Sequence, residues 1–580
     1  MKEKIKQNVQ EAELYKKFKR ISVAEFFERN RHLLGFDSPR KALLIAIKEY
    51  VDNSLDACEE YKILPDIKVE IDGLENDIYK VTVEDNGPGI PYESVPEIFG
   101  SFLFGSKFHR FISTRGKQGI GASAVTLYSQ LTTKEPVEII TKMKNKEKGI
   151  KYKIKIDVKT NTPIILEKEE VEMKKDSGTI VKAKIIGQYI KGKQSVDEYI
   201  KLTALINPHT NIIYKNPDGE KFVYKRIINY IPELKEVKPH PYGIELGYFD
   251  RLIREAKEKT LINFLTKTFS SVGQNTAIEI LKKAKLDPDI DPKTLNDDQI
   301  IKLYNALQNA RLRAIPSKYI VTLGRDIILK SMENILKPEY MAAIRRKPGL
   351  YRGIPFIVEV GIAYGGGINE FQYYRFANRV PLLYKPGEDA ITHALKEINW
   401  KHYGFEVEGE FPKDPMAILV HIASVWLPFT SESKEAIAPY DEIVREIELG
   451  IKNALRELSI YIKKKKALET IGDKYKNLYG YGLEVIDSLS SILDIKKEKV
   501  EKRLKERIKR ELVNDVYEIL KSVREVKNLL KEGKDDRAVT LIKNMLKDAV
   551  KINLLSEKEL EDTIMEVIND VKKDKLSLLN

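Results

Sequence analysis

The chain has little cysteine and tryptophan and no long hydrophobic run. One cysteine among 580 residues excludes internal disulfide bonds. The longest apolar segment, residues 417–429, contains a histidine, a serine and a proline and is too short to cross a bilayer. The first residues, Met-Lys-Glu-Lys-Ile-Lys, contain no apolar signal segment. We therefore expect a cytoplasmic protein without membrane spans, in which Cys58 is an inert core thiol.

Positive charge, by contrast, is in excess. The chain has 100 lysine and arginine residues against 87 aspartate and glutamate residues, which gives a formal net charge of +13. Such an excess suggests a polyanionic partner, although a surface rich in lysine and glutamate is also typical of thermophile proteins. A chain of this length has room for roughly three to five domains, each with its own core.

The most informative segment is a predicted helix that follows Ser38, a cap residue, and has Pro39 in its first turn. At 100° per residue its apolar residues share one face, within about 40° of Val51, and its acidic and amide residues lie on the opposite face. The apolar set is Leu44, Ile47, Val51, Leu55 and Cys58, and the polar set is Glu49, Asn53 and Asp56. On its own, a polar face of this kind usually indicates only a solvated helix surface.

Two glycine-containing blocks follow and change that interpretation. Residues 81–84 alternate like a half-buried strand and end at Asp85, and Gly87 and Gly89 follow, where missing Cβ atoms let the backbone approach a flat ligand. The second block, residues 116–121, reads Gly-Lys-Gln-Gly-Ile-Gly and precedes a predicted helix from Ala122. The three blocks in this order predict an ATP site that is not a P-loop.

Two further motifs imitate ligand sites. Residues 187–193 have the spacing of a Walker A loop, but Gln194 stands where Ser or Thr must bind Mg²⁺. Residues 287–291 resemble the start of a calcium loop, but Pro292 and Asp298 replace the required glycine and glutamate. We expect an exposed basic turn at the first motif and a helix-capping turn at the second.

The three blocks resemble the ATP site of the Bergerat-fold, or GHKL, ATPases, a superfamily that includes gyrase-type topoisomerase subunits, heat-shock protein 90, MutL and sensor histidine kinases. The resemblance implies that Glu49 is the general base for the attacking water and that Asn53 holds Mg²⁺. It also implies that Asp85 accepts a hydrogen bond from the adenine 6-amino group, and that the hydroxyl of Thr179 supports Asp85.

The same resemblance implies a lid over the phosphates, with the positive end of the helix from Ala122 directed at them. The residues expected to contact nucleotide are Asn53, Asp85, Gly87, Gly89, Ser106, Lys107, Arg115, Gly116, Lys117, Gln118, Gly119, Ile120, Gly121, Ala122, Thr179 and Lys434. Lys434 is included because the second domain of these ATPases, the transducer, contributes a lysine to the γ-phosphate. Its place is the polar loop that follows a predicted strand at 417–427.

Beyond residue 235 the pattern changes to short helices, predicted at 247–269, 276–285 and 297–312. With Lys267, Lys282, Lys283 and Lys285, this block resembles a helix-two-turn-helix module, and a helical spacer is an equal alternative. Strands predicted at 319–323, 355–360, 373–383 and 417–427, with a helix at 388–398, indicate βαβ crossovers.

Two basic segments in this second α/β region leave two interpretations open. Residues 400–403, Trp-Lys-His-Tyr, interleave aromatic and basic side chains, which could clamp nucleic acid or simply pack in a core. The basic run Arg345-Arg346-Lys347 leaves the same choice between DNA contact and structure. From residue 441 the pattern is helical to the end, beginning with one long helix over 441–468.

The order of these regions resembles the B subunits of archaeal type IIB topoisomerases, the topoisomerase VI family. We predict an α+β multidomain protein with an N-terminal arm (1–20), a GHKL α/β-sandwich ATPase domain (21–234), an inserted helix-two-turn-helix domain (235–314), an α/β transducer with the start of a stalk helix (315–470) and a helical C-terminal tail (471–580).

The resemblance also implies partners. The chain would dimerise on binding ATP, close around double-stranded DNA and work in an A₂B₂ heterotetramer with the topoisomerase VI A subunit, which carries the tyrosine for strand cleavage. A MutL-like mismatch-repair ATPase is one alternative class, although it would not require the inserted helical block. A chaperone of the heat-shock protein 90 type is another, although its client-binding domains and charged linker are not evident.

Overall fold

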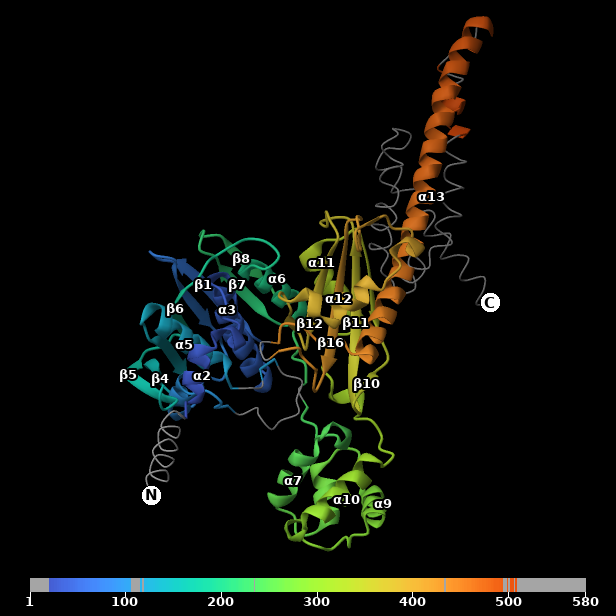
Figure 1. Ribbon diagram of the computed structural model, residues 1–580. Helices are drawn as coiled ribbons and strands as arrows, with labels where there is room; N and C mark the ends of the chain where they lie inside the picture. Colours follow the sequence, from blue (N-terminus) through green and yellow to red (C-terminus); the bar gives the residue numbers. More distant parts are fainter. Residues whose placement is uncertain are drawn as a thin grey trace, which may run out of the picture.

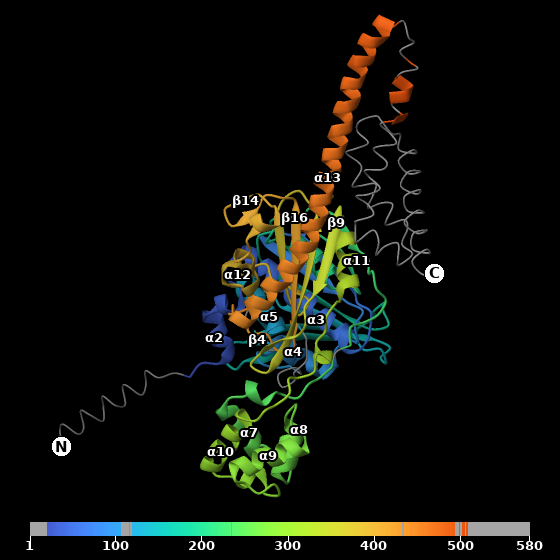
Figure 2. The same ribbon diagram turned by 90° about the vertical axis from the view of Figure 1, so that its right-hand side faces the viewer.

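The computed structural model describes residues 20–105, 115–116, 119–233, 235–431 and 434–493, together with residues 498, 501–504 and 506–507. An α/β domain and a second α/β domain lie side by side, a small helical domain lies below them, and one long helix projects from the second domain (Figure 1). After a quarter turn the second α/β domain lies in front of the first, and the helical domain is again below them (Figure 2). The chain is therefore a multidomain α+β protein, as predicted.

The first domain is built on an eight-stranded sheet with the strand order β5-β4-β3-β6-β2-β1-β7-β8. Among these neighbours only β1 and β7 are parallel. Alternate residues are buried along most strands, so one face of the sheet packs in the core. The strands are β1 (Asp66–Gly73), β2 (Ile78–Glu84), β3 (Val137–Lys142), β4 (Gly149–Asp157), β5 (Thr162–Val171), β6 (Gly178–Ile186), β7 (Asn211–Lys215) and β8 (Lys221–Tyr224).

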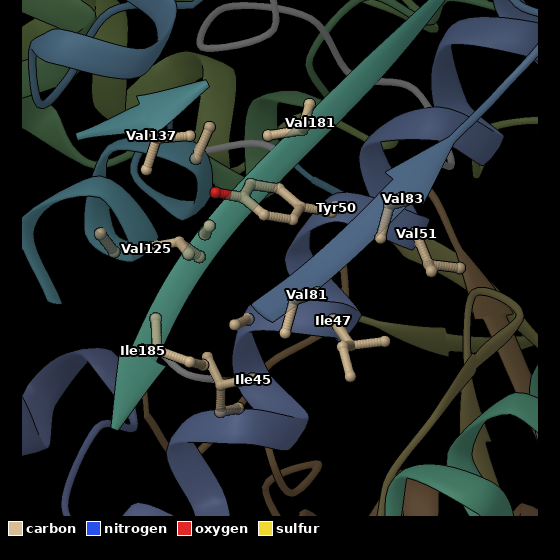
Figure 3. Packing of buried hydrophobic residues seen from close by; sticks show 14 of the residues in the cluster. Ile45, Ile47, Tyr50, Val51, Val81, Val83, Val125, Val137, Val181 and Ile185 are labelled. Atoms are coloured by element: carbon tan, nitrogen blue, oxygen red, sulfur yellow. The ribbon is translucent and has the colours of Figure 1, made fainter. Parts of the chain in front are cut away.

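Helices cover that buried face, and the longest of them confirms the predicted helix. The Ser38 side chain accepts a hydrogen bond from the Lys41 N–H, and Pro39 occupies the first helical position. Side chains of α3, α5 and strands β2, β3 and β6 interdigitate in one core (Figure 3). The helices of this domain are α2 (Val23–Arg29), η1 (Arg31–Leu34), α3 (Pro39–Glu60), η2 (Tyr92–Ser94), α4 (Val95–Gly100), α5 (Gly121–Thr133) and α6 (Val196–Ile206).

The helical domain has a hydrophobic cluster of its own. The single helix predicted at 247–269 is wrong, because the chain leaves the helix after Arg254 and Thr260 caps a new one by accepting a hydrogen bond from the Asn263 N–H. Asp291 caps a short helix in the segment that imitated a calcium loop. The elements are η3 (Pro241–Gly243), α7 (Leu246–Arg254), α8 (Leu261–Thr268), α9 (Gln274–Ala284), η4 (Pro292–Thr294) and α10 (Asp297–Gln308).

The second α/β domain contains a sheet of order β10-β11-β16-β12-β13, with β9 also paired to β11. Helix α12 joins the parallel strands β12 and β16, which confirms one predicted βαβ crossover. Its main elements are η5 (Ser317–Tyr319), α11 (Arg325–Leu336), β9 (Tyr340–Arg345), β10 (Gly349–Tyr351), β11 (Ile354–Tyr364), β12 (Gln372–Ala377), β13 (Val380–Pro381), η6 (Pro386–Glu388), α12 (Ala390–Lys396), η7 (Trp400–Tyr403), β14 (Val407–Glu408), β15 (Phe411–Pro412) and β16 (Met416–Ser424).

Two predicted strands of this domain are corrected. Residues 319–323 form no strand, because the backbone N–H groups of Leu323 and Gly324 bind the buried Glu359 carboxylate instead of a neighbouring strand. Residues 373–383 form two strands that turn at Asn378 and Arg379, both of which have positive φ. That turn directs Arg379 toward the first domain.

The long helix α13 (Asp441–Leu493) begins at the residue predicted and continues past residue 468. Its first part packs on the second domain, where Glu446 pairs with Arg346 at 3.0 Å, and Glu339 binds both Tyr461 and Lys465. The rest extends away from the sheet (Figures 1 and 2). None of the helices among the described residues is long and apolar enough to cross a membrane.

Candidate active site

The Glu49 carboxylate lies against the first turn of α5. A Cβ atom built on Gly121, the first residue of α5, would lie 1.9 Å from Glu49 Oε2, so glycine leaves the space that this carboxylate occupies. Asn53, one turn further along α3, is exposed and lies near Gly116, on which a Cβ atom would be 3.7 Å from Asn53 Oδ1. Among the described residues, Ile120 at the N-cap position makes no side-chain hydrogen bond to α5. The positive end of this helix lies against the Glu49 carboxylate.

Lys48 is a neighbour of this carboxylate that the sequence analysis missed. Its Nζ lies 3.0 Å from Asp52 Oδ2 and 3.6 Å from Glu49 Oε1. Burial lowers the pKa of Lys48, but the attraction of Asp52 and Glu49 outweighs burial and holds that pKa above its ordinary value. Tyr199 fixes Asp52 from the other side through a 3.1 Å hydrogen bond. The available signal was the spacing of Lys48 and Asp52, four residues apart on a helix.

Asp85 follows β2 directly, and its carboxylate is buried among hydrogen-bond donors. Its Oδ1 accepts hydrogen bonds from the backbone N–H groups of Gly87 at 2.9 Å and Thr179 at 3.1 Å, and its Oδ2 accepts from the Ser54 hydroxyl at 2.8 Å. Burial raises the pKa of Asp85, and these three donors oppose the rise. A carboxylate has about four acceptor positions, so Oδ2 retains one for a ligand N–H.

Thr179 supports Asp85 through its backbone, whereas the sequence analysis expected its hydroxyl. The Thr179 hydroxyl instead lies 3.1 Å from the Thr141 hydroxyl, and Thr141 also accepts a hydrogen bond from the Ile90 N–H. Gly89 has a φ of +75°, and a Cβ atom on it would lie 2.2 Å from the Lys142 carbonyl oxygen. The turn after Asp85 is therefore packed closely on the end of β3 at Gly89.

The predicted lid is described only in part. Ser106, Lys107, Lys117 and Gln118 lie outside the described residues. The Gly116 N–H donates to Asp56 Oδ2 at 3.1 Å, and the Gly119 carbonyl accepts from the Leu103 N–H. Ile120 immediately precedes α5, and Gly121 and Ala122 form its first turn. The two described ends of the lid thus lie at α3 and at the start of α5.

The Arg115 side chain makes its contacts within the protein. Its guanidinium is fully buried and binds Asp56 Oδ1 at 2.9 Å, Glu59 Oε1 at 2.7 Å and the Asn207 side chain. These carboxylates hold the pKa of Arg115 above its ordinary value despite the opposing effect of burial. The predicted nucleotide contact of Arg115 stays a prediction. Its guanidinium anchors the base of the lid to α3.

Lys434 reaches the same segment from the second domain. It lies in a hairpin loop closed by the Phe429 and Ile437 backbone, and its Nζ donates to the Arg115 carbonyl at 3.2 Å. Burial lowers the pKa of Lys434, Lys48 lowers it further, and Glu49 is the first of several carboxylates that oppose this. The adjacent Glu435 pairs with Lys41 of α3. A pocket between the two domains is lined by residues that include Lys48, Tyr199, Tyr384 and Lys434.

Some of the candidate DNA-contacting residues are buried or paired within the protein, and others are exposed. Trp400 and Tyr403 are buried, and Trp400 packs edge-to-face on Phe371, which favours the core interpretation of this pair. Lys401 and His402 are exposed. Arg346 is engaged by Glu446 of α13. The four lysines of the helical domain, Lys267, Lys282, Lys283 and Lys285, are all exposed.

Comparisons with known proteins agree with this arrangement. Residues 42–179 match a family described as histidine kinase-, DNA gyrase B- and HSP90-like ATPase, and residues 316–474 match one described as topoisomerase VI B subunit, transducer. The B subunit of type 2 DNA topoisomerase 6 from Archaeoglobus fulgidus is 43% identical over 77% of this chain and 75% of its own length. The corresponding protein from Metallosphaera sedula is 40% identical over 86% of this chain and 94% of its own length.

Among solved structures, the ATPase region of yeast topoisomerase II aligns with 77% of this chain at 15% identity and a TM-score of 0.36, a score too low to add to the assignment.

The fold and the match over residues 42–179 define an ATPase of the GHKL class. Within that class, the transducer match and the relatives decide the branch. The chain belongs to the family of type 2 DNA topoisomerase 6 B subunits. The MutL-like and chaperone alternatives are thereby set aside.

Proposed function

We propose that this chain is the ATP-binding and ATP-hydrolysing subunit of a type II DNA topoisomerase, with the domain boundaries given by the sequence analysis. The observation that carries the proposal is the convergence of two domains on one short segment. The Glu49 carboxylate, from α3, lies against the start of α5, and Lys434 of the second domain binds the Arg115 carbonyl at the base of the lid. A catalytic carboxylate and a phosphate-sensing lysine would then act on the same nucleotide.

Asp85 would recognise adenine. Three donors already occupy most of its acceptor positions and fix its orientation. The remaining position on Oδ2 suits the 6-amino group of adenine, because that group is a donor, whereas guanine presents a carbonyl oxygen at the same place. Gly87, on which a Cβ atom would lie 3.0 Å from Asp85 Oδ1, would leave the backbone beside this carboxylate free of a side chain, so that a flat base can approach it. Gly89 would complete the turn that carries this backbone.

Glu49 would take the proton from the attacking water, and Lys48 would restrain its carboxylate. The donors fit Mg²⁺, because Asn53 presents an exposed amide oxygen and a nucleotide-bound Mg²⁺ needs only one or two protein oxygens besides phosphate and water. When bound, Mg²⁺ would neutralise phosphate charge, and Asn53 would hold it. The backbone of Gly116, Gly119, Ile120, Gly121 and Ala122 would wrap the phosphates at the start of α5, together with Ser106, Lys107, Lys117 and Gln118.

The relatives supply the larger assembly. Their name implies DNA and a partner protein. We infer that ATP joins two copies of this chain into a clamp around double-stranded DNA, and that an A₂B₂ heterotetramer with the topoisomerase VI A subunit passes one duplex through another in the cytoplasm. The exposed lysines of the helical domain would contact the phosphate backbone.

Glu49→Ala tests the core of the proposal. The variant should bind ATP with nearly wild-type affinity and lose ATP hydrolysis, because it removes the base and leaves the adenine contacts intact. Glu75→Ala, an exposed glutamate in the turn between β1 and β2, is the control and should hydrolyse ATP normally. Sedimentation should show dimers with a non-hydrolysable ATP analogue and monomers without it. Hydrolysis at the wild-type rate by Glu49→Ala would remove Glu49 from its role, and an unchanged sedimenting mass would remove the clamp.

A further inference from the structure

A buried ion network joins the base of the lid to the second domain through one residue, Glu59, in the last turn of α3. The Glu59 side chain is fully buried. Its Oε1 accepts from Arg115 at 2.7 Å, and Arg379 binds both oxygens, with NH1 2.7 Å from Oε1 and NH2 2.8 Å from Oε2. Such a two-pronged pair fixes orientation as well as distance. His209 Nε2 also lies 2.9 Å from Oε1.

Among the described residues of this network, the formal charges sum to zero when both domains are counted. Asp56, Glu59 and Arg115 all belong to the first domain and together carry one excess negative charge. Burial lowers the pKa of His209, so the ring is neutral at pH 7 and does not supply the missing positive charge. Arg379, from the turn between β12 and β13, supplies it. Without Arg379 a buried carboxylate would lack compensation, which is strongly unfavourable.

The network continues into the second domain through hydrogen bonds. The Arg379 backbone N–H donates to His421 Nε2 at 3.1 Å, which places the ring proton on Nδ1, 2.9 Å from Glu359 Oε2. Glu359 in turn accepts from the backbone N–H groups of Leu323 and Gly324, directly before α11. The turn that carries Arg379 is therefore tied to the body of the transducer and cannot move alone.

Arg115 is consequently held by the second domain at two points. Lys434 binds its carbonyl oxygen, and Arg379 binds the carboxylate that holds its guanidinium. If Arg115 were displaced, its contact with Glu59 or the Glu59–Arg379 pair would have to break, or the transducer would have to move with it.

We propose that Glu59 and Arg379 are positioning residues that couple the lid to the transducer, so that the state of the phosphates sets the angle between the two domains. The inference rests on the proposed ATP site. The Glu59–Arg379 pair would be a second link between the two domains besides Lys434. It would respond to the position of the lid base, whereas Lys434 would respond to the γ-phosphate itself.

The test uses the full chain with Arg379→Gln and Arg379→Lys. Arg346→Gln is the matched control, because Arg346 makes an ion pair of 3.0 Å with Glu446 wholly within the second domain and its long helix. The readouts are the Kd of a non-hydrolysable ATP analogue, kcat and KM for ATP, and the change in small-angle scattering between analogue and ADP states.

Arg379→Gln should lose most of the scattering change and lower kcat about tenfold, as expected when a coupling free energy is removed, while the analogue Kd stays within about threefold of wild type. Arg379→Lys should have a scattering change and a kcat between those of wild type and Arg379→Gln, because lysine keeps the charge and loses the two-pronged pairing. If Arg379→Gln does not fold, Arg379→Lys decides the question. Arg346→Gln should match wild type.

The outcomes separate this inference from the proposed function. If wild type binds analogue and changes shape, and both Arg379 variants change as much, the coupling role is wrong and the ATP site stands. If the Arg379 variants lose affinity for analogue and ADP in parallel with their stability, the pair is only structural and the inference is again wrong. If wild type does not bind the analogue, the proposed function fails and this inference fails with it.

Discussion

The two ends of the candidate ATP site are built in different ways. At the adenine end, Asp85 is held by donors from α3, the β2 turn and β6, all within the first domain. At the phosphate end, Arg115 is held between carboxylates of α3 and two cations of the second domain, Lys434 directly and Arg379 through Glu59. The proposed adenine end is therefore built by the first domain alone, whereas the proposed phosphate end has contacts from both domains.

The physical difference between the ends is the kind of interaction used. Backbone N–H groups and a hydroxyl at the adenine end are fixed by the sheet and do not depend on charge balance. The ions at the phosphate end are buried, so each depends strongly on its partners and the loss of one affects the others. We expect changes at the phosphate end to alter turnover and domain movement, and changes at the adenine end to alter binding alone.

Gly121→Ala should give the largest effect. A methyl group at 1.9 Å from Glu49 Oε2 must displace the carboxylate, and misplacement of a reacting group by about 1 Å costs about 10²-fold in rate. The cost in stability should be small, because the displaced atom is the end of a flexible side chain and alanine favours a helix by up to about 1 kcal/mol. Steady-state ATPase rates and denaturant unfolding measure the two effects.

Gly247→Ala is the control for that prediction, because Gly247 lies in the first turn of α7 and a Cβ atom on it would meet nothing within 4 Å. It should leave the ATPase rate unchanged. Wild-type hydrolysis by Gly121→Ala would mean that the carboxylate at this helix start is not the base.

Lys434→Ala should have the next largest effect on the rate of ATP hydrolysis. It removes the cation that reaches the lid from the second domain, so ADP should bind almost normally while hydrolysis falls about tenfold and the scattering change between analogue and ADP states shrinks. Lys401→Ala, an exposed lysine of the same domain, should have no effect. A Lys434→Ala protein that switches fully would show that another group reads the phosphate.

Asp85→Asn tests the adenine end. An amide keeps the shape of the side chain but removes the charged acceptor, and a hydrogen bond to a charged group contributes about 1.5–3 kcal/mol, or roughly 10- to 100-fold in affinity. ATP and ADP should be weakened equally, because both carry the same base. Calorimetric titration with each nucleotide measures this. A loss confined to ATP would contradict the division of the site into two independent ends.

The sequence was sufficient to predict the parts of the site that depend on short-range patterns of residues. The cap at Ser38, the faces of α3, the strand ending at Asp85 and the helix start at Gly121 all follow from short-range patterns, and the structure confirms these elements. The position of Lys434 near the lid followed from resemblance, and the 3.2 Å contact with Arg115 agrees with it.

Long-range contacts were not predictable. Glu59 and Arg379 are 320 residues apart, and neither stands in a recognisable motif. Arg115 adjoins the predicted lid, but nothing in the local sequence indicates that its guanidinium is buried against Asp56 and Glu59. Residues 319–323 are mostly apolar, as in a buried strand, but the N–H groups of Leu323 and Gly324 bind Glu359, a partner that no local pattern reveals.

The smallest expected effect is a pH dependence that comes from the phosphate end. Burial lowers the pKa of His209, and the repulsion of Arg379 and Arg115 adds to this against the hydrogen bond with Glu59. In the unfolded chain the ring regains its ordinary pKa of about 6.5. Below about pH 6.5 the unfolded state therefore binds more protons than the folded state, so stability should fall as the pH is lowered and stay constant above that value. Burial also lowers the pKa of His240, which adds a contribution of the same sign outside the ATP site.

Thermal unfolding of wild type at pH 7.5, 6.5 and 5.5 should show the midpoint falling between the last two. His209→Gln should reduce that fall, because it removes one of the two rings whose pKa is lowered by burial. His402→Gln, at an exposed position, should leave the fall unchanged. Nuclear magnetic resonance of the histidine rings gives the sharper measurement. The pKa of the His209 ring should lie below its ordinary value of about 6.5 in wild type and rise toward that value in Arg379→Gln, since that variant removes a neighbouring positive charge. An ordinary pKa for His209 in wild type would show that the network around Glu59 is not closed to water as described.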